Sequence, residues 1–172
     1  WVGTFHGLAH RLLRLHWQEA GLPESFQVLD ADDQLRMVKR IATSLELEEG
    51  RFPPRQIVWW INAQKDEGRR PKHIQVPGGD FFTKTMLRVY EEYEIRCQRA
   101  GLVDFAEILL RAHELWLEHP PLLHHYQQRF GQILVDEFQD TNTIQYAFIR
   151  VLAGDSGQVF VVGDDDQAIY GW

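Results

Sequence analysis

The sequence predicts an α/β fold that is mostly helical, with two parallel strands near its C-terminal end. Ile133–Val135 is an apolar run that we expect to form a short strand buried on both faces, and Val159–Val162 repeats the pattern. Asp136 follows the first run directly, and Asp164 follows the second after one glycine. The apolar side chains between the runs recur at the spacing of a helix with one buried face. They are Ile144, Ala147, Phe148, Val151 and Leu152. Two strands joined by a helix are expected to be parallel.

The first half of the chain is predicted to be helical. Thr4 is expected to cap a first helix, which ends at the Gly-Leu-Pro turn of residues 21–23. Asp30 is expected to cap a second helix with an apolar stripe. A third helix should follow two prolines and cover about residues 56–67, before a glycine- and proline-rich loop over residues 68–80.

Three more helices are expected before the strand pair. The first of them should run for about five turns from Phe81 to a stop at Gly101. Asp104 and Glu107 have the spacing of a capping box at the start of the next helix. The last follows two adjacent prolines and ends near residue 130. We therefore expect residues 8–130 to form a helical block without a strand.

Two adjacent carboxylates, Asp136 and Glu137, follow the first strand. Open parallel sheets place their chemistry at the carboxyl ends of strands. In nucleotide hydrolases with a phosphate-cradling loop, an Asp at this place helps to hold Mg²⁺, and a neighbouring carboxylate can deprotonate the attacking water. Because adjacent strand-end residues point in different directions, the pair suits a metal and a γ-phosphate. The alternative is a solvated turn after a strand.

Four segments resemble motifs of one enzyme family. Val135–Asn142 and Val162–Trp172 are similar to motifs II and III of the superfamily 1 DNA helicases of the UvrD/Rep/PcrA group. Thr4–Leu8 resembles that group's Thr-Phe-His motif, and Gly101–Phe105 resembles a further motif in its helical insertion. The resemblance runs from the first residues to the last. Position 168 is Ala where the group often has Ser.

The resemblance implies a fold and an activity. Residues 1–7 and 131–172 would belong to a RecA-like P-loop motor domain, interrupted by an all-helical subdomain over residues 8–130. The activity would be ATP-dependent 3′-to-5′ translocation on DNA, in repair and replication. The chain lacks the phosphate-binding loop Gly-x-x-x-x-Gly-Lys-Ser/Thr. It therefore looks like an internal piece of a helicase, and we expect the isolated chain to hydrolyse no ATP.

The same resemblance implies roles for three residues of the ATP site. Asp136 would hold Mg²⁺, and Glu137 would be the general base for the attacking water. Gln167 would sense the γ-phosphate, because an amide can donate to a phosphate oxygen while it accepts from water. Gln167 could also be a surface amide at the end of a strand.

Five residues are candidates for contact with DNA. Tyr170 and Trp172 would stack on single-stranded bases by resemblance, and core packing is their alternative. Thr4, Phe5 and His6 lie at a helix start, where backbone N–H groups favour phosphate. Their alternative is a helix cap followed by a core phenylalanine. The implied partners are single-stranded DNA, junctions of single and double strands, and DNA-repair proteins.

The composition excludes some classes of protein. No apolar run reaches the ~18 residues of a membrane span, and no signal peptide is visible, so we expect a cytoplasmic protein. The single cysteine, Cys97, excludes an internal disulfide framework and is expected to pack in the core. The net charge is −7, but residues 133–172 hold seven acidic residues and one arginine. The remainder is nearly neutral and can present basic patches to phosphates.

Two other classes remain open from the residues alone. The helical block could be a DNA- or protein-interaction module without chemistry. The carboxylate cluster could instead belong to a metal-dependent nuclease. One basic region near the middle of the chain is either solvated surface or a contact to the DNA backbone. Its members are Lys65, Arg69, Arg70, Lys72 and His73.

Overall fold

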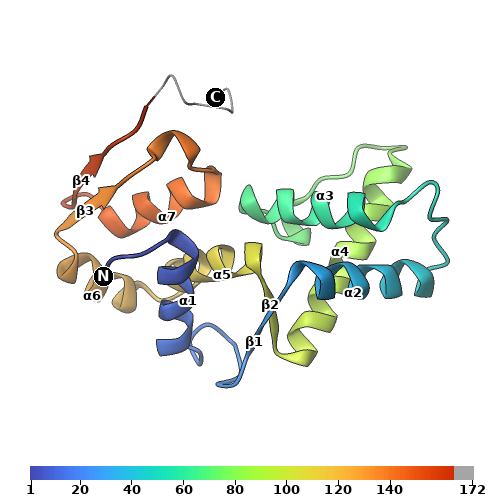
Figure 1. Cartoon of the computed structure of the whole chain (residues 1–172), viewed down its shortest axis with the longest axis horizontal. Coiled ribbons are helices and arrows are strands. Elements are labelled where there is room, and N and C mark those ends of the chain that lie inside the picture. Colours follow the sequence, from blue (N-terminus) through green and yellow to red (C-terminus); the bar gives the residue numbers. More distant parts are fainter. Residues whose placement is uncertain (165–172) are drawn as a thin grey trace.

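The computed structural model describes residues 1–164, and its elements form two lobes with a parallel strand pair between them (Figure 1). One lobe contains the first helix, the last three helices and the C-terminal strands, and the other contains the three central helices. The helices are α1 (Phe5–Leu15), α2 (Ala31–Ser44), α3 (Pro54–Asp66), α4 (Phe81–Ala100), α5 (Phe105–Glu118), α6 (Pro120–Arg129) and α7 (Thr143–Ala153). The strands are β1 (Gln27–Leu29), β2 (Leu102–Asp104), β3 (Gln132–Val135) and β4 (Gln158–Val161), and η1 (Pro71–His73) and η2 (Phe138–Asp140) are 3₁₀ turns.

The first lobe packs α1, α5, α6 and α7 around one apolar core. Leu12 of α1, Leu109 and Trp116 of α5, and Phe148 of α7 are buried in it. The rings of Trp116 and Phe148 stack with centroids 4.3 Å apart. Trp1 packs on the edge of this core. The N-terminal residues and the helix between the C-terminal strands therefore share one core, although they lie far apart in the sequence.

The second lobe packs α2, α3 and α4 around a separate apolar core. Val38 and Ile41 of α2, Ile57 of α3, and Tyr90 and Tyr93 of α4 have no exposed surface. Cys97 is also buried here, as expected, and burial raises the pKa of its thiol to about 11. A thiol of that kind is mostly protonated near neutral pH, so it behaves as a small apolar side chain.

A strand pair that the sequence did not predict crosses between the lobes. β1 and β2 are parallel, with Gln27 opposite Leu102 and Leu29 opposite Asp104. The expectation that residues 8–130 contain no strand is wrong at this point. Each strand has three residues, which is too short to display an alternating pattern, and the partners lie about 75 residues apart. Both connections between the lobes pass through this pair (Figure 1).

The helix boundaries follow the expected caps. Thr4 Oγ1 accepts from the backbone N–H of Gly7 at 3.1 Å, and Asp30 accepts from Asp33 at 2.8 Å. Gly101 ends α4 in the left-handed conformation, with φ of 65°. Local side-chain and glycine signals are sufficient here, because each satisfies backbone groups that the helix end leaves free.

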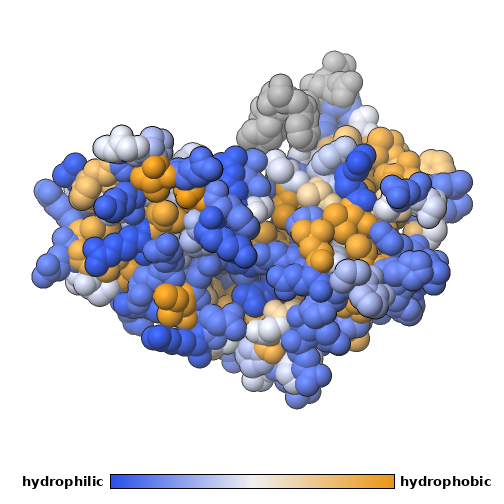
Figure 2. Space-filling view, turned by 180° about the vertical axis from the view of Figure 1, so that it is seen from behind, coloured by the Kyte–Doolittle hydropathy of each residue, from blue (hydrophilic) through white to orange (hydrophobic). Residues whose placement is uncertain are grey.

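The C-terminal strands are parallel as predicted, but they are not buried on both faces. Ile133 lies opposite Val159 and Val135 opposite Val161. Leu134 is 73% exposed and Phe160 53% exposed, and Figure 2 shows hydrophobic side chains gathered on the side where these strands lie. Within residues 1–164 this sheet has two strands, and no second layer covers its outer face.

The chain does not pass from one core to the other at the positions where we expected a domain boundary. It passes between the cores near residues 27 and 102, so α1, α5 and α6 share a core with α7. The division into residues 1–7 with 131–172, and 8–130, stays a prediction. No helix in the described part of the chain is both long and apolar enough to span a bilayer.

Candidate functional site

Asp136 and Glu137 lie at the carboxyl end of β3, and both side chains are exposed. Asp136 Oδ1 accepts from the backbone N–H of Glu137 at 2.8 Å, which fixes one carboxylate oxygen and leaves Oδ2 without a contact of that kind. Glu137 has φ of 52°, a left-handed conformation that costs a non-glycine residue about 1–2 kcal/mol. The backbone is therefore strained where the sequence places the candidate base.

The end of β4 is tied to the same turn by three hydrogen bonds. Val162 donates to the carbonyl of Val135 at 2.8 Å, and Phe138 donates to the carbonyl of Val162 at 3.0 Å. The side-chain oxygen of Gln139 accepts from the backbone N–H of Asp164 at 3.1 Å. A Cβ at Gly163 would lie 2.6 Å from that oxygen, so a larger residue there would displace the end of the Gln139 side chain. The two strand ends thus form one unit.

Gln139 is a residue of this site that sequence reasoning did not single out. The Asp-Glu-Phe-Gln-Asp segment gave no sign that Gln139 links the two strand ends, because its hydrogen-bond partner is a backbone N–H 25 residues later in the sequence. Gln167, Tyr170 and Trp172 lie outside the described residues. Among residues 1–164 no group of three or more His, Cys, Asp or Glu side chains could hold a metal ion. An exposed carboxylate fits Mg²⁺ all the same, since Mg²⁺ keeps several waters and uses one or two carboxylates.

Thr4, Phe5 and His6 begin α1 on the first lobe. Thr4 caps the helix, as the structural alternative required, and Phe5 is half-buried against the core. A cavity of about 140 Å³ is lined by Leu8 of α1 and by Ile133 of β3, so the two segments border the same space.

His6 is paired with an aromatic residue that we did not select from the sequence. Its ring stacks on Phe105 with centroids 3.7 Å apart and an angle of 12° between the planes. Burial lowers the pKa of His6, and a hydrogen bond with the backbone of Phe105 opposes that effect. Phe105 is 62% exposed although it begins a helix whose following residues are buried. The Gly101–Phe105 motif was the available signal.

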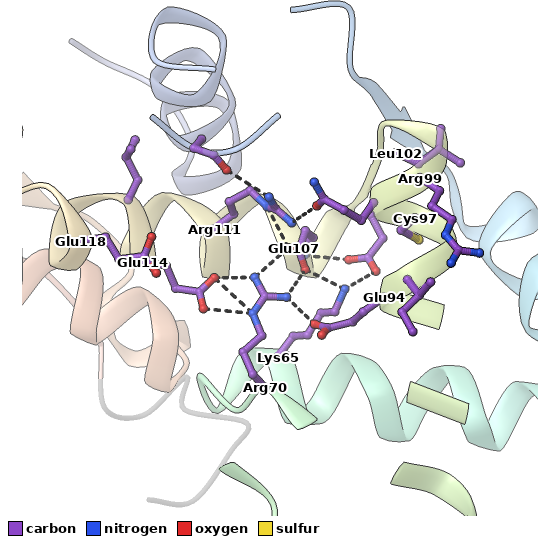
Figure 3. A pocket seen from close by; sticks show the side chains of 15 residues that line it. Lys65, Arg70, Glu94, Cys97, Arg99, Leu102, Glu107, Arg111, Glu114 and Glu118 are labelled. Atoms are coloured by element: carbon purple, nitrogen blue, oxygen red, sulfur yellow. Dashed lines mark hydrogen bonds and ion pairs between the residues drawn. The ribbon is translucent and has the colours of Figure 1, made fainter. Parts of the chain in front are cut away.

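The structure corrects the expectation for the basic region. Lys65 is buried at the end of α3, and Arg70 is mostly buried, so these two are not solvated surface (Figure 3). Both form ion pairs with Glu107 of α5. Arg69, Lys72 and His73 are exposed. The expected capping box is confirmed only in part. Asp104 caps α5, but the side chain of Glu107 forms ion pairs with Lys65 and Arg70 instead of completing the box.

The strand-end carboxylates on an α/β scaffold, with the Thr-Phe-His segment on the same lobe, agree with a comparison to known families. Residues 1–172 match the UvrD/REP helicase N-terminal domain, and the chain belongs to this family. Its whole length is 63% identical to DNA helicase II of Escherichia coli and 55% identical to DNA helicase II of Haemophilus influenzae, and it covers 24% of each. It is 37% identical to the ATP-dependent DNA helicase PcrA of Leuconostoc citreum, covering 23%.

These matches confirm the resemblance to the UvrD/Rep/PcrA group, and to bacterial DNA helicase II within it. The chain spans about a quarter of the length of the relatives it matches.

Proposed function

We propose that this chain is part of an ATP-dependent DNA helicase that translocates 3′-to-5′ on single strands. The observation that supports this proposal best is the Asp136–Glu137 pair at the end of a parallel strand, in a chain of the UvrD/REP helicase family. The names of the relatives, DNA helicase II and ATP-dependent DNA helicase PcrA, describe those proteins and support the same activity here.

In this proposal Asp136 holds Mg²⁺ and Glu137 is the general base. Mg²⁺ neutralises charge on the β- and γ-phosphate oxygens of ATP. The Asp136 oxygen that accepts from Glu137 N–H is held in place, and the other oxygen is left for the ion or one of its waters. The carboxylate of Glu137, which is exposed at the same strand end, acts on the water that attacks the γ-phosphate. Gln167 contacts that phosphate and reports its presence.

Single-stranded DNA meets the first lobe at its aromatic and helix-start residues. Thr4, Phe5 and His6 begin α1, where the free N–H groups favour a backbone phosphate. Phe105, exposed and stacked on His6, extends this face and can stack on a base. Tyr170 and Trp172 supply further stacking and link the γ-phosphate to DNA.

The proposal also assigns the larger setting. Residues 1–7 and 131–172 are part of a RecA-like motor domain, and residues 8–130 form the helical insertion. The parent enzyme acts in the cytoplasm, in DNA repair and replication, on single strands and their junctions with duplex, with DNA-repair proteins as partners. The chain by itself has no phosphate-binding loop and hydrolyses no ATP.

A segment exchange tests this function. The matching 172 residues of E. coli DNA helicase II are replaced by this chain, and DNA-stimulated ATP hydrolysis and duplex unwinding are measured. We expect both activities to be retained in the exchanged protein, and none in the isolated chain. A folded exchange protein that binds DNA without hydrolysing ATP would instead support an interaction module. Mg²⁺-dependent DNA cleavage by the isolated chain would support a nuclease.

A further inference from the structure

A group of charged side chains fills the space between the two lobes, beside a cavity of about 500 Å³ (Figure 3). Its cations come from the end of α3 and the loop that follows, and its carboxylates come mainly from the start of α5. Lys65 Nζ lies 2.7 Å from Asp104 Oδ2 and 2.9 Å from Glu107 Oε2. The side chains of Lys65 and Asp104 are 2% and 1% exposed.

Asp104 is the residue on which the second lobe converges. Its Oδ2 accepts from Lys65 of α3, from the hydroxyl of Tyr93 of α4 at 2.6 Å, and from the amide of Gln34 of α2 at 3.4 Å. Its Oδ1 accepts from the backbone N–H of Glu107 at 2.7 Å and so caps α5. Each helix of the second lobe therefore contacts the same carboxylate, at the point where α5 begins.

Arg70 makes a second connection to α5. It donates two hydrogen bonds to Glu107, at 2.7 and 2.9 Å, in the bidentate geometry that suits guanidinium and carboxylate. It also contacts Glu114, which lies about two turns further along α5 than Glu107. A fourth contact is with Glu94 of α4. Arg70 thus joins α4 to two carboxylates of α5.

The charges are held in their ionised forms. Burial acts to lower the pKa of Lys65, but the attraction of Glu107 and Asp104 outweighs it and the pKa is raised. Burial acts to raise the pKa of Glu107, and Lys65 and Arg70 overcome it and hold that pKa well below its usual range. Losing one partner would leave a buried charge uncompensated, so the arrangement tolerates little displacement.

The residue next to Asp104 is Phe105, whose ring lies on His6. The capping carboxylate and the exposed ring belong to adjacent residues, so the contacts that locate one also locate the other. The stacked rings belong to α1 and to the first residue of α5, both in the first lobe. The second lobe contacts the start of α5 through Asp104 and Glu107.

We propose that Lys65 and Arg70 are positioning residues of the DNA face: they hold the first turns of α5 so that Phe105 lies on His6. The inference rests on the proposed function, since it takes this ring pair as a contact for single-stranded DNA. It assigns to the interlobe ion pairs a role that reaches the DNA face without either cation contacting DNA.

The experiment uses Arg70→Lys, which keeps the charge but loses the bidentate fork, and Lys65→Met. Arg40→Lys and Lys39→Met are matched controls, because both side chains are exposed on α2. Affinity for fluorescein-labelled oligo(dT) is measured by anisotropy in the unaltered background and with Phe105→Ala. We expect Arg70→Lys to weaken binding about tenfold, as for one misplaced stack on a base, and to add nothing to Phe105→Ala.

A second measurement needs no DNA and stays informative if Lys65→Met fails to fold. Stacking on Phe105 shifts the His6 imidazole C–H resonances upfield, and we expect Arg70→Lys to reduce that shift while Arg40→Lys leaves it unchanged. The positioning role would be overturned if Arg70→Lys left the His6 shift unchanged, or if the affinity losses of Arg70→Lys and Phe105→Ala were additive. Absence of oligo(dT) binding by the unaltered chain would overturn the proposed DNA contact instead.

Discussion

Lys65 carries a positive charge at a position almost completely shielded from water. A lone buried ammonium would be very costly, so its place depends on Asp104 and Glu107. Single residues also decide the strand-end turn: Glu137 takes a left-handed backbone, and Gly163 leaves room for the Gln139 side chain. Lys65 and Gly163 were visible in the sequence as residue types, but Asp104 and Gln139, which they approach, lie more than 20 residues away.

At this scale we predict that Lys65→Met lowers the free energy of unfolding by about 3–5 kcal/mol, because it leaves Asp104 buried without its cation and removes one of the cations that contact Glu107. Urea denaturation followed by circular dichroism measures the change. Adding Asp104→Asn should recover part of the loss, since asparagine is neutral and still caps a helix. Lys39→Met, at an exposed position, is the control and should change stability by less than about 0.5 kcal/mol. An equal, small effect of both lysine variants would contradict the account.

Local sequence patterns predict some of the elements and not others. α4 was predicted from Phe81 to Gly101 because a long apolar stripe and a terminal glycine are local signals. β1 and β2 were missed, since three-residue strands are defined by each other rather than by their own pattern. β3 was found but expected to be buried on both faces. Its exposed face reflects which other elements lie nearby, which residues 132–135 cannot encode.

The candidate site was predictable to a similar extent. Asp136, Glu137, Thr4 and His6 were identified from motifs, and the structure places the first two at one strand end. Phe105 came only from the ring stack, and Gln139 only from a hydrogen bond across the strands. The ion pairs were out of reach of sequence reasoning, because Lys65 and Arg70 have the same appearance in a sequence whether they are solvated or buried.

The end of α4 carries the prediction at the scale of elements. Gly101 has φ of 65°, and a Cβ there would lie 2.8 Å from Pro23 Cγ. Gly101→Ala should therefore lower the free energy of unfolding by at least about 1–2 kcal/mol. Gly78→Ala is the matched control, because nothing lies within 4 Å of a Cβ at that position. Thermal or urea unfolding of both variants measures this, and a neutral Gly101→Ala would show that the turn is not constrained as described.

Within residues 1–164 the structure has two apolar cores, and the β1–β2 pair and the ion pairs around Asp104 are among the contacts that connect them. The strand pair contributes backbone pairing and the buried side chains of Leu29 and Val103, and the ion pairs contribute charge. The ion pairs therefore make the fold sensitive to conditions that alter ionisation. Acidic pH is the most direct of these.

We predict that the free energy of unfolding decreases as pH falls below about 6.5, and decreases again below about 4.5. Burial lowers the pKa of His6, His10 and His113, so the unfolded chain binds more protons than the folded chain in the first range. Glu107 has a depressed pKa, so its contribution is complete above its usual pKa and is lost as pH falls toward the folded value. Urea unfolding at pH 8, 7, 6, 5 and 4 measures both steps. Constant stability from pH 8 to pH 5 would contradict the histidine part.

The most direct measurement of the central claim is ATP turnover by the E. coli DNA helicase II that carries this segment, with and without Glu137→Gln. Glu49→Gln, an exposed glutamate on the second lobe, is the control. We predict that Glu137→Gln leaves ATP binding nearly unchanged while turnover falls by about 10²–10⁴-fold, because the general base is lost. Turnover close to that of the Glu49→Gln control would remove Glu137 from the chemistry and leave the strand-end carboxylates without their proposed role.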